Sequence, residues 1–314
     1  MISFAAAEEA AKQEYADWRS GNIPSGTKVT HQEYWEMKYR QNRYLSHLSD
    51  QELAQRLDAV MNNMVGLTPD EKIKFLSHNE TQKDWQAEFT VLLEESRLRH
   101  TGLPTHLLHE LHHPDYDWPG IPKAAAEFHT LNVKGGEYLV KYLQLNHGKE
   151  AFEKGRIQVN PASTFKDPSL NYALEDDELQ LSLRPPSKTD PTVLVSATNY
   201  YVYCMTNEFD LRLFGDFKYN ACLIITEPAV FVERLAHKAL RQLPRWRAEA
   251  YPVIYVDPVR PNSMELDIFR TKDFRYSYQK EYRIVWLPPF PLFTLKPIIV
   301  ELGDLSDSCH LISL

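Results

Sequence analysis

The run Ala-Cys-Leu-Ile-Ile-Thr at residues 221–226 decides the fold class of this chain. Five consecutive apolar side chains are typical of a β-strand that is buried on both faces of a sheet. Residues 231–242 follow with apolar side chains at helical spacing, which predicts an amphipathic helix. A fully buried strand followed by an amphipathic helix places this part of the chain in the mixed α/β class.

Further strand patterns lie on both sides of this run. Residues 138–143 are rich in β-prone side chains, and residues 156–159 alternate polar with apolar ones. Between them we expect a short helix at residues 148–154 that stops at Gly155. The acidic stretch 175–190 is interpreted as a loop or a short hairpin. The remaining predicted strands lie within residues 192–206 (two strands), 253–256, 281–286 and 298–301.

The first 130 or so residues are instead typical of helices. Ser49 and Glu52 have the spacing of a capping box, so we expect a helix that begins after Ser49. Thr68-Pro69, followed by two acidic residues, predicts a second helix start. A third amphipathic helix is expected from Trp85 onward. Such apolar stripes are packing faces, and we assign no chemistry to them.

The composition changes between residues 104 and 136, where prolines at positions 104, 114, 119 and 122 are followed by Gly135-Gly136. Proline and glycine interrupt regular structure, so we place a domain boundary there. We therefore predict an α+β chain, with a helical domain of residues 1–130 and an α+β domain of residues 131–314.

Composition and charge exclude several classes of protein. The three cysteines have no Cys-x-x-Cys spacing, which argues against a disulfide framework and a cysteine-based zinc site. We recognise no signal peptide and no apolar run of about 20 residues, so we expect a cytoplasmic protein that does not enter a membrane. A net charge of −8 argues against tight non-specific binding of nucleic acid. The local basic cluster of Arg241, Arg245 and Arg247 is interpreted as the solvated end of a helix.

The sequence His109-Glu110-Leu111-His112-His113 matches the HExxH pattern of zinc hydrolases. On a helix, His109 and His113 share one face and bind Zn²⁺, while Glu110 activates a bound water molecule. Pro104 and Pro114 confine any such helix to about two turns, and the segment is rich in histidine throughout. We interpret it as a solvated surface helix without a catalytic metal, and keep a zinc-dependent hydrolase as an alternative function.

Three short motifs in the second half of the chain suggest a family. Lys141-Tyr142 comes first, Ser163–Pro168 (STFKDP) follows a predicted strand, and Tyr278–Ile284 (YQKEYRI) closes the series. In order and spacing they resemble a bacterial family of largely uncharacterised domains with Lys-Tyr, Phe-Asn-Asp-Pro and Glu-Tyr-Arg motifs. Lys166 departs from that pattern, because the family usually has Asn there. The resemblance covers residues 137–301.

The same arrangement resembles the ADP-ribosyltransferase fold, including the toxins that modify DNA bases. The resemblance implies a mixed, mostly antiparallel split β-sheet and NAD as a substrate. It also implies transfer of ADP-ribose from NAD to a nucleic acid or protein acceptor, in a toxin or defence setting. The helical domain would then bind a regulatory partner, recognise the substrate or serve assembly. A catalytically inactive module that binds a nucleotide or a partner is an alternative within the same fold.

The resemblance also assigns roles to single residues. Gln279 and Glu281 match its Gln/Glu-x-Glu triplet, and residues two apart on a strand point to the same side. Glu281 would stabilise an oxocarbenium-like ribose through its 2′-hydroxyl, as in glycoside hydrolysis, while Gln279 orients the attacking group. The residues expected to bind NAD in one cleft with this pair are Lys141, Tyr142, Arg156, Ser163, Thr164 and Phe165. Without the resemblance, the pattern favours Glu281 as one charge on the exposed face of an edge strand.

Overall fold

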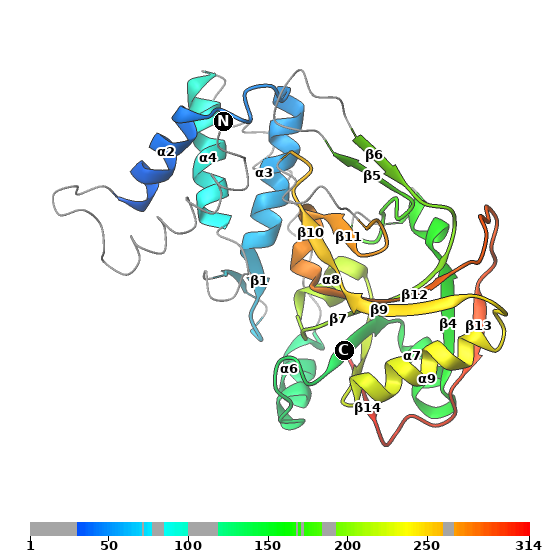
Figure 1. Ribbon diagram of the computed structural model, residues 1–314. Helices are drawn as coiled ribbons and strands as arrows, with labels where there is room; N and C mark the ends of the chain where they lie inside the picture. Colours follow the sequence, from blue (N-terminus) through cyan, green and yellow to red (C-terminus); the bar gives the residue numbers. More distant parts are fainter. Residues whose placement is uncertain are drawn as a thin grey trace.

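The computed structural model describes residues 30–70, 72–76, 85–99, 119–167, 169–170, 173–183, 193–259 and 267–314. In these parts the chain is α+β, and its main sheet is built from antiparallel pairs (Figure 1). The predicted fold class is confirmed at this level. Among the described helices, none combines the length and apolar character needed to cross a membrane.

The main sheet divides along one central strand, β7 (Tyr201–Thr206). One edge of β7 pairs with β12 (Glu281–Leu287), which pairs in turn with β9 (Arg247–Pro252). The other edge is shared by two strands. β4 (Arg156–Pro161) pairs with the first residues of β7, and β3 (Leu139–Leu143) meets it only at its last residue, Thr206. The sheet therefore opens between β3 and β4.

Each half of the sheet continues outward from this opening. β3 pairs with β8 (Ala221–Ile225), and β8 with β14 (Cys309–Ser313). On the other side, β4 pairs with β13 (Ile298–Glu301). All five residues of β8 are buried, as the apolar run predicts.

Helices cover both faces of the sheet. α7 (Leu145–Lys154) and α9 (Pro228–Leu240) pack on one face, over alternate residues of β3, β7 and β8. α6 (Ile121–Thr130) and α8 (Arg212–Phe217) pack on the other face. α6 precedes the expected domain boundary in sequence, yet its buried side chains belong to this core.

Gly155 ends α7, as expected from the sequence. Its backbone is left-handed, with φ at 61°, and a Cβ atom there would lie 1.9 Å from the carbonyl oxygen of Gly303. Only glycine fits both constraints. The turn thereby fixes where β4 starts.

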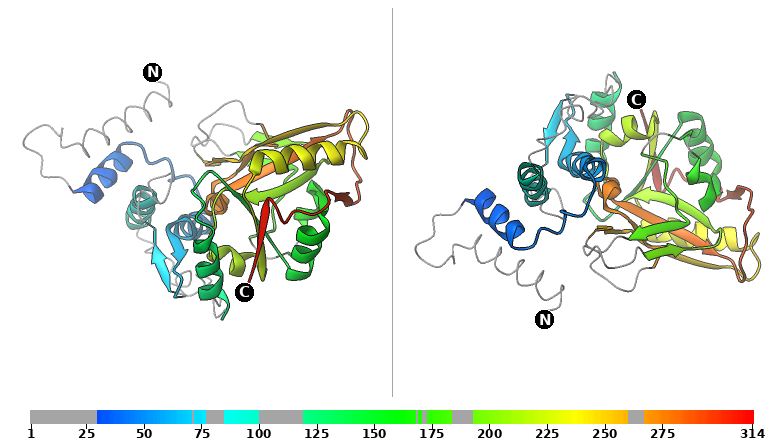
Figure 2. Two further views of the ribbon diagram at one scale, coloured as in Figure 1. Left: turned by 90° about the horizontal axis from the view of Figure 1, so that it is seen from below. Right: turned by 90° about the horizontal axis from the view of Figure 1, so that it is seen from above.

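The N-terminal helices pack against a C-terminal segment. They are α2 (His31–Gln41), α3 (Asp50–Met64) and α4 (Trp85–Leu98), and α3 begins with the predicted capping box at Ser49. Their shared core includes Phe274, the first residue of the 3₁₀ helix η2 (Phe274–Gln279). Both views of Figure 2 show α3 beside η2. The helices thus support the segment that leads into β12.

One predicted helix start is wrong. Thr68-Pro69 lies in the turn of a small hairpin formed by β1 (Val65–Leu67) and β2 (Ile73–Phe75). The Thr68 hydroxyl accepts a hydrogen bond from the Lys72 amide at 3.0 Å and donates one to Asp70 at 2.6 Å. Thr, Pro and Asp favour turns and helix starts alike, and here the hydroxyl closes a turn.

Two further strand pairs and a short helix lie outside the main sheet. β5 (Gln180–Leu183) and β6 (Val193–Ser196) form an antiparallel pair that includes part of the stretch expected to be a loop or hairpin. β10 (Ile254–Val256) and β11 (Thr271–Asp273) form a parallel pair, and β11 leads directly into η2. The 3₁₀ helix η1 (Ala162–Lys166) follows β4.

Candidate functional site

At the opening between β3 and β4, one lysine side chain reaches from β3 to β7. Val140 and Thr206 form the single backbone pair between these strands. Beyond it, Lys141 Nζ donates a hydrogen bond of 2.7 Å to the Cys204 carbonyl oxygen and lies 4.6 Å from the Tyr203 ring centre. Burial lowers the pKa of this lysine. We call this junction of β3 and β7, from the Val140–Thr206 pair to the Lys141–Cys204 hydrogen bond, the seam.

Glu281 lies at the seam, where β12 begins opposite Thr206. Its carboxylate accepts hydrogen bonds from Arg283 Nε at 2.6 Å and from Lys272 Nζ at 3.0 Å. Burial by itself raises the pKa of Glu281, but the two cations outweigh it and hold this pKa well below its ordinary value. Glu281 is only 5% exposed, so the expected open cleft around it is not present in this conformation.

Gln279 also contacts Lys272, but not through the shared strand that the sequence predicts. It is the last residue of η2, and Lys280 follows with a left-handed backbone, so Gln279 and Glu281 do not share a strand. The side-chain oxygen of Gln279, Oε1, nevertheless accepts a hydrogen bond from Lys272 Nζ at 3.3 Å. The argument from strand periodicity is therefore wrong, while the two side chains do meet at one cation.

Two more carboxylates complete a buried ionic cluster. Glu178 lies 2.7 Å from Arg283 Nη2, and Asp176 lies 3.4 Å from Lys272 Nζ. We call the five residues Asp176, Glu178, Lys272, Glu281 and Arg283 the seam cluster. It holds three carboxyl groups against two cations, so one carboxyl lacks a cation of its own. Burial accordingly raises the pKa of Glu178 to about 7.

A segment of the chain covers this cluster. The Asp176 amide donates to the Phe165 carbonyl oxygen at 2.9 Å, and Gln279 Nε2 donates to the Ala173 carbonyl oxygen at 2.7 Å. Tyr276 adds a hydrogen bond of 2.5 Å to the Glu175 carbonyl oxygen. Described residues 173–179, which we call the acidic strap, are thus tied down by the groups that flank Glu281.

We predict that Glu178 titrates near neutral pH. Its folded-state pKa of about 7 lies above the ordinary value of 4.5. It therefore contributes stability that is fully present below pH 4.5 and is lost as the pH rises through about 7. Carboxyl ¹³C NMR should give a midpoint near 7 that Glu178→Gln removes. Glu281→Gln should lower the midpoint, because repulsion from that carboxylate is lost. A Glu178 midpoint below about 5 in the wild type contradicts this description of the cluster.

Tyr142 does not contact the seam cluster. By strand register it shares a sheet face with Glu281, whereas Lys141 points to the other face. Its hydroxyl is hydrogen-bonded to the backbone of Asp210 at 2.8 Å, and its ring packs against Phe214. At 3% exposure, Tyr142 has no free ring face for stacking on nicotinamide.

The other expected NAD ligands are spread over different surfaces. Phe165 packs in the core that contains Cys204 and anchors the acidic strap through its carbonyl oxygen. Ser163 is hydrogen-bonded to the Asn199 side chain, and Thr164 is exposed. Arg156 lies at the far end of β4 and forms a 3.6 Å ion pair with Glu150. The structure therefore brings Gln279 and Glu281 to one cation, with Lys141 across the nearby seam, and it places Tyr142, Arg156, Ser163 and Thr164 outside the seam cluster.

Sequence reasoning missed four residues of the seam cluster, Asp176, Glu178, Lys272 and Arg283. Arg283 carried a signal, because it is two residues from Glu281 on one strand and so shares its face. Lys272 carried no such signal, because η2 lies between it and Glu281 in the chain, and only the path of η2 brings the two side chains together. Glu178 lies in the stretch that the sequence predicts to be a loop or a short hairpin, and no function was assigned to that stretch. Only the tertiary fold places Glu178 against Arg283.

The described residues contain no group of three or more His, Cys, Asp and Glu side chains that could hold a metal ion. The HExxH segment, residues 109–113, lies outside the described residues. No family model, curated protein or solved structure matches the chain in the comparisons with known proteins.

Proposed function

We propose that the seam is an NAD site and that the protein transfers ADP-ribose from NAD to a macromolecular acceptor. One observation carries the proposal: Glu178 and Glu281 lie in one buried cluster, and their pKa values are shifted in opposite directions. A pair of carboxyl groups separated in this way is suited to divide the ionised and proton-carrying roles of a reaction. The match of Gln279 and Glu281 to the transferase triplet supplies the reaction class.

In this mechanism Glu281 stays ionised and accepts a hydrogen bond from the ribose 2′-hydroxyl. The bond between ribose C1′ and the nicotinamide nitrogen breaks, and nicotinamide leaves with the electron pair. Positive charge that develops on the ribose strengthens the contact with Glu281. The acceptor nucleophile then bonds to C1′ and gives up its proton. Glu178, with a pKa of about 7, takes that proton.

Access to Glu281 requires residues 173–176 of the acidic strap to move, while Glu178 stays paired with Arg283. The hydrogen bonds at Ala173, Glu175 and Asp176 are the contacts that must break. The phosphates of NAD are negatively charged, as are the carboxylates paired with Lys272. When NAD enters at the seam, its phosphates would therefore displace carboxylates from Lys272. In this proposal the acidic strap covers the site when no substrate is bound, and it moves away from the site when NAD binds.

A binding module without turnover is the second candidate. It is favoured by the ion pairs of Glu281, because both carboxylate oxygens already bind Lys272 and Arg283. A toxin or defence role and a regulatory partner on the helices remain proposals that follow the resemblance. The zinc hydrolase stays a hypothesis about residues 109–113, which zinc analysis of the purified chain would test.

The function is tested with the full chain. We expect nicotinamide release from NAD when denatured DNA, RNA and cell lysate are supplied as acceptors, together with NAD binding by calorimetry. Binding without release under any of these conditions would favour the binding module instead. If the chain neither binds NAD nor releases nicotinamide, the transferase is ruled out and a module that binds another partner is left.

A further inference from the structure

The end of the sheet where β12 stops and β9 begins carries a local excess of positive charge. Lys238 lies on α9, Arg241 caps that helix, and Arg245 lies in the following turn with φ at 69°. Arg247 opens β9 and pairs with Glu249 at 3.3 Å. Within the described part of the chain no ion pair involves Lys238, Arg241 or Arg245. Three uncompensated cations gather here although the net charge of the chain is −8.

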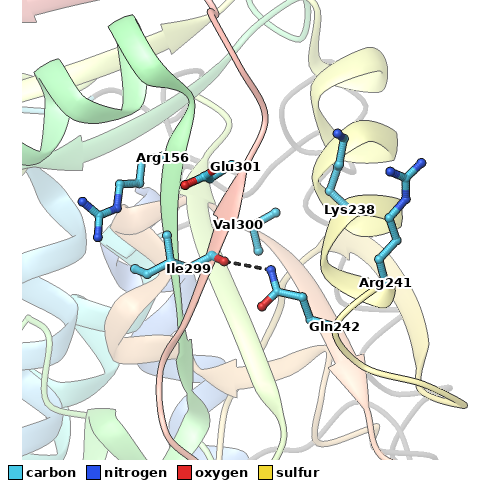
Figure 3. Close-up of a pocket in the computed structure, with 7 residues that line it drawn as sticks. All are labelled: Arg156, Lys238, Arg241, Gln242, Ile299, Val300 and Glu301. Atoms are coloured by element: carbon cyan, nitrogen blue, oxygen red, sulfur yellow. Dashed lines mark hydrogen bonds between the residues drawn. The ribbon is translucent and has the colours of Figure 1, made fainter.

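A hollow beside these cations extends the positive surface. It has a volume of about 380 Å³ and lies between α9 and β13. Lys238 and Arg241 stand on the helix side, Arg156 stands on the strand side, and Glu301 is the acidic residue in the lining. In Figure 3 the cations extend away from one another and do not converge on one point. Charges spaced in this way fit a row of phosphates better than a single anion.

Two aromatic side chains project from the adjoining loop. Phe290 and Phe293, between β12 and β13, are 61% and 83% exposed. The loop starts next to Arg247, because Leu287 pairs with Arg247 at the end of β12. Figure 2 shows the loop and the turn after α9 at the same end of the sheet in both views. Exposed phenylalanine rings beside uncompensated cations form a mixed surface.

We propose that this surface binds single-stranded nucleic acid. We call it the basic–aromatic edge, and it consists of Lys238, Arg241, Arg245, Arg247, Phe290 and Phe293. Proteins that bind single strands combine a cationic track for the backbone with aromatic rings on which bases stack. Here the α9 side supplies the track and the loop supplies the rings. The proposal adds a binding role to an arginine cluster that is interpreted from the sequence as the solvated end of a helix. The binding needs no NAD, so it stands or falls separately from the proposed transfer reaction.

The test measures binding of a fluorescent oligothymidylate of about 12 nucleotides to the full chain by anisotropy at several salt concentrations. Arg241→Glu/Arg245→Glu should weaken binding at least about tenfold and reduce the salt slope by about 1.4, which corresponds to two lost phosphate contacts. Phe293→Ala should weaken binding about tenfold and leave the salt slope unchanged, since it removes stacking alone.

The matched control is Lys123→Glu/Lys134→Glu, which changes net charge equally at two exposed lysines around α6. It should leave the affinity close to that of the wild type, because distant surface charges are screened by salt. Circular dichroism checks that each variant is folded. Equal losses in the two double variants, full competition by polyglutamate at equal charge, or no wild-type binding at low salt would each overturn the proposal.

Discussion

Replacing Asp257 with alanine should lower the free energy of unfolding by about 3–5 kcal/mol. Asp257 follows β10 and binds Arg56 of α3, with Nη1 to Oδ1 at 2.8 Å and Nη2 to Oδ2 at 2.5 Å. Both side chains are less than a tenth exposed. The variant leaves the Arg56 guanidinium buried with Glu88 as its remaining carboxylate partner. The loss is large because the buried guanidinium gives up both of its hydrogen bonds to Asp257, and Glu88 binds Nη2 alone.

Asp70→Ala is the matched control for this prediction. Asp70 pairs with Lys72 at 2.5 Å, but these side chains are 61% and 78% exposed. Exposed pairs are weakened by solvent, so this variant should change stability far less than Asp257→Ala does. Urea unfolding followed by tryptophan fluorescence compares the two variants. If Asp257→Ala costs no more than Asp70→Ala, then Arg56 does not hold the helices to the sheet domain in the way described.

The fold was predictable where one local pattern had one structural solution. The apolar run at 221–225 can only be buried on both faces, and Gly155 both ends a helix and admits the close approach of Gly303. The capping box at Ser49 satisfies helix amides with its own side chains. Thr68-Pro69 shows the limit of this reasoning, because the same residues suit a turn and a helix start.

The site was predictable only in part, for a related reason. The spacing of Arg283 and Glu281 on β12 correctly predicts that these two residues share a face. The same argument fails for Gln279, because Gln279 belongs to η2 and not to the strand. Asp273 accepts a hydrogen bond from the Arg275 amide at 2.9 Å and starts a 3₁₀ helix. Lys272 and Glu178 join the cluster through tertiary contacts, which no short pattern encodes. The burial of Glu281 is likewise a tertiary property that no short pattern indicates.

Replacing Glu281 with glutamine should slow nicotinamide release by about 10²–10³-fold. The change keeps the shape of the side chain but removes the negative charge that would face the developing positive charge on ribose. Because Glu281 is buried between Lys272 and Arg283, we also expect some loss of stability. The interpretation of Glu281 as a charge on an exposed edge strand is wrong, because β12 is paired on both sides and Glu281 is buried. Rates must therefore be compared at a temperature where both proteins are folded.

The rate of nicotinamide release at saturating NAD, measured for the wild type, Glu281→Gln and Glu301→Gln, tests the central claim most directly. Glu301 is an exposed strand glutamate on β13, away from the seam, and serves as the control. The proposed mechanism predicts an active wild type, an unchanged Glu301→Gln and a Glu281→Gln variant at least about 100-fold slower that is still folded and still binds NAD. Equal rates for the wild type and Glu281→Gln would contradict it.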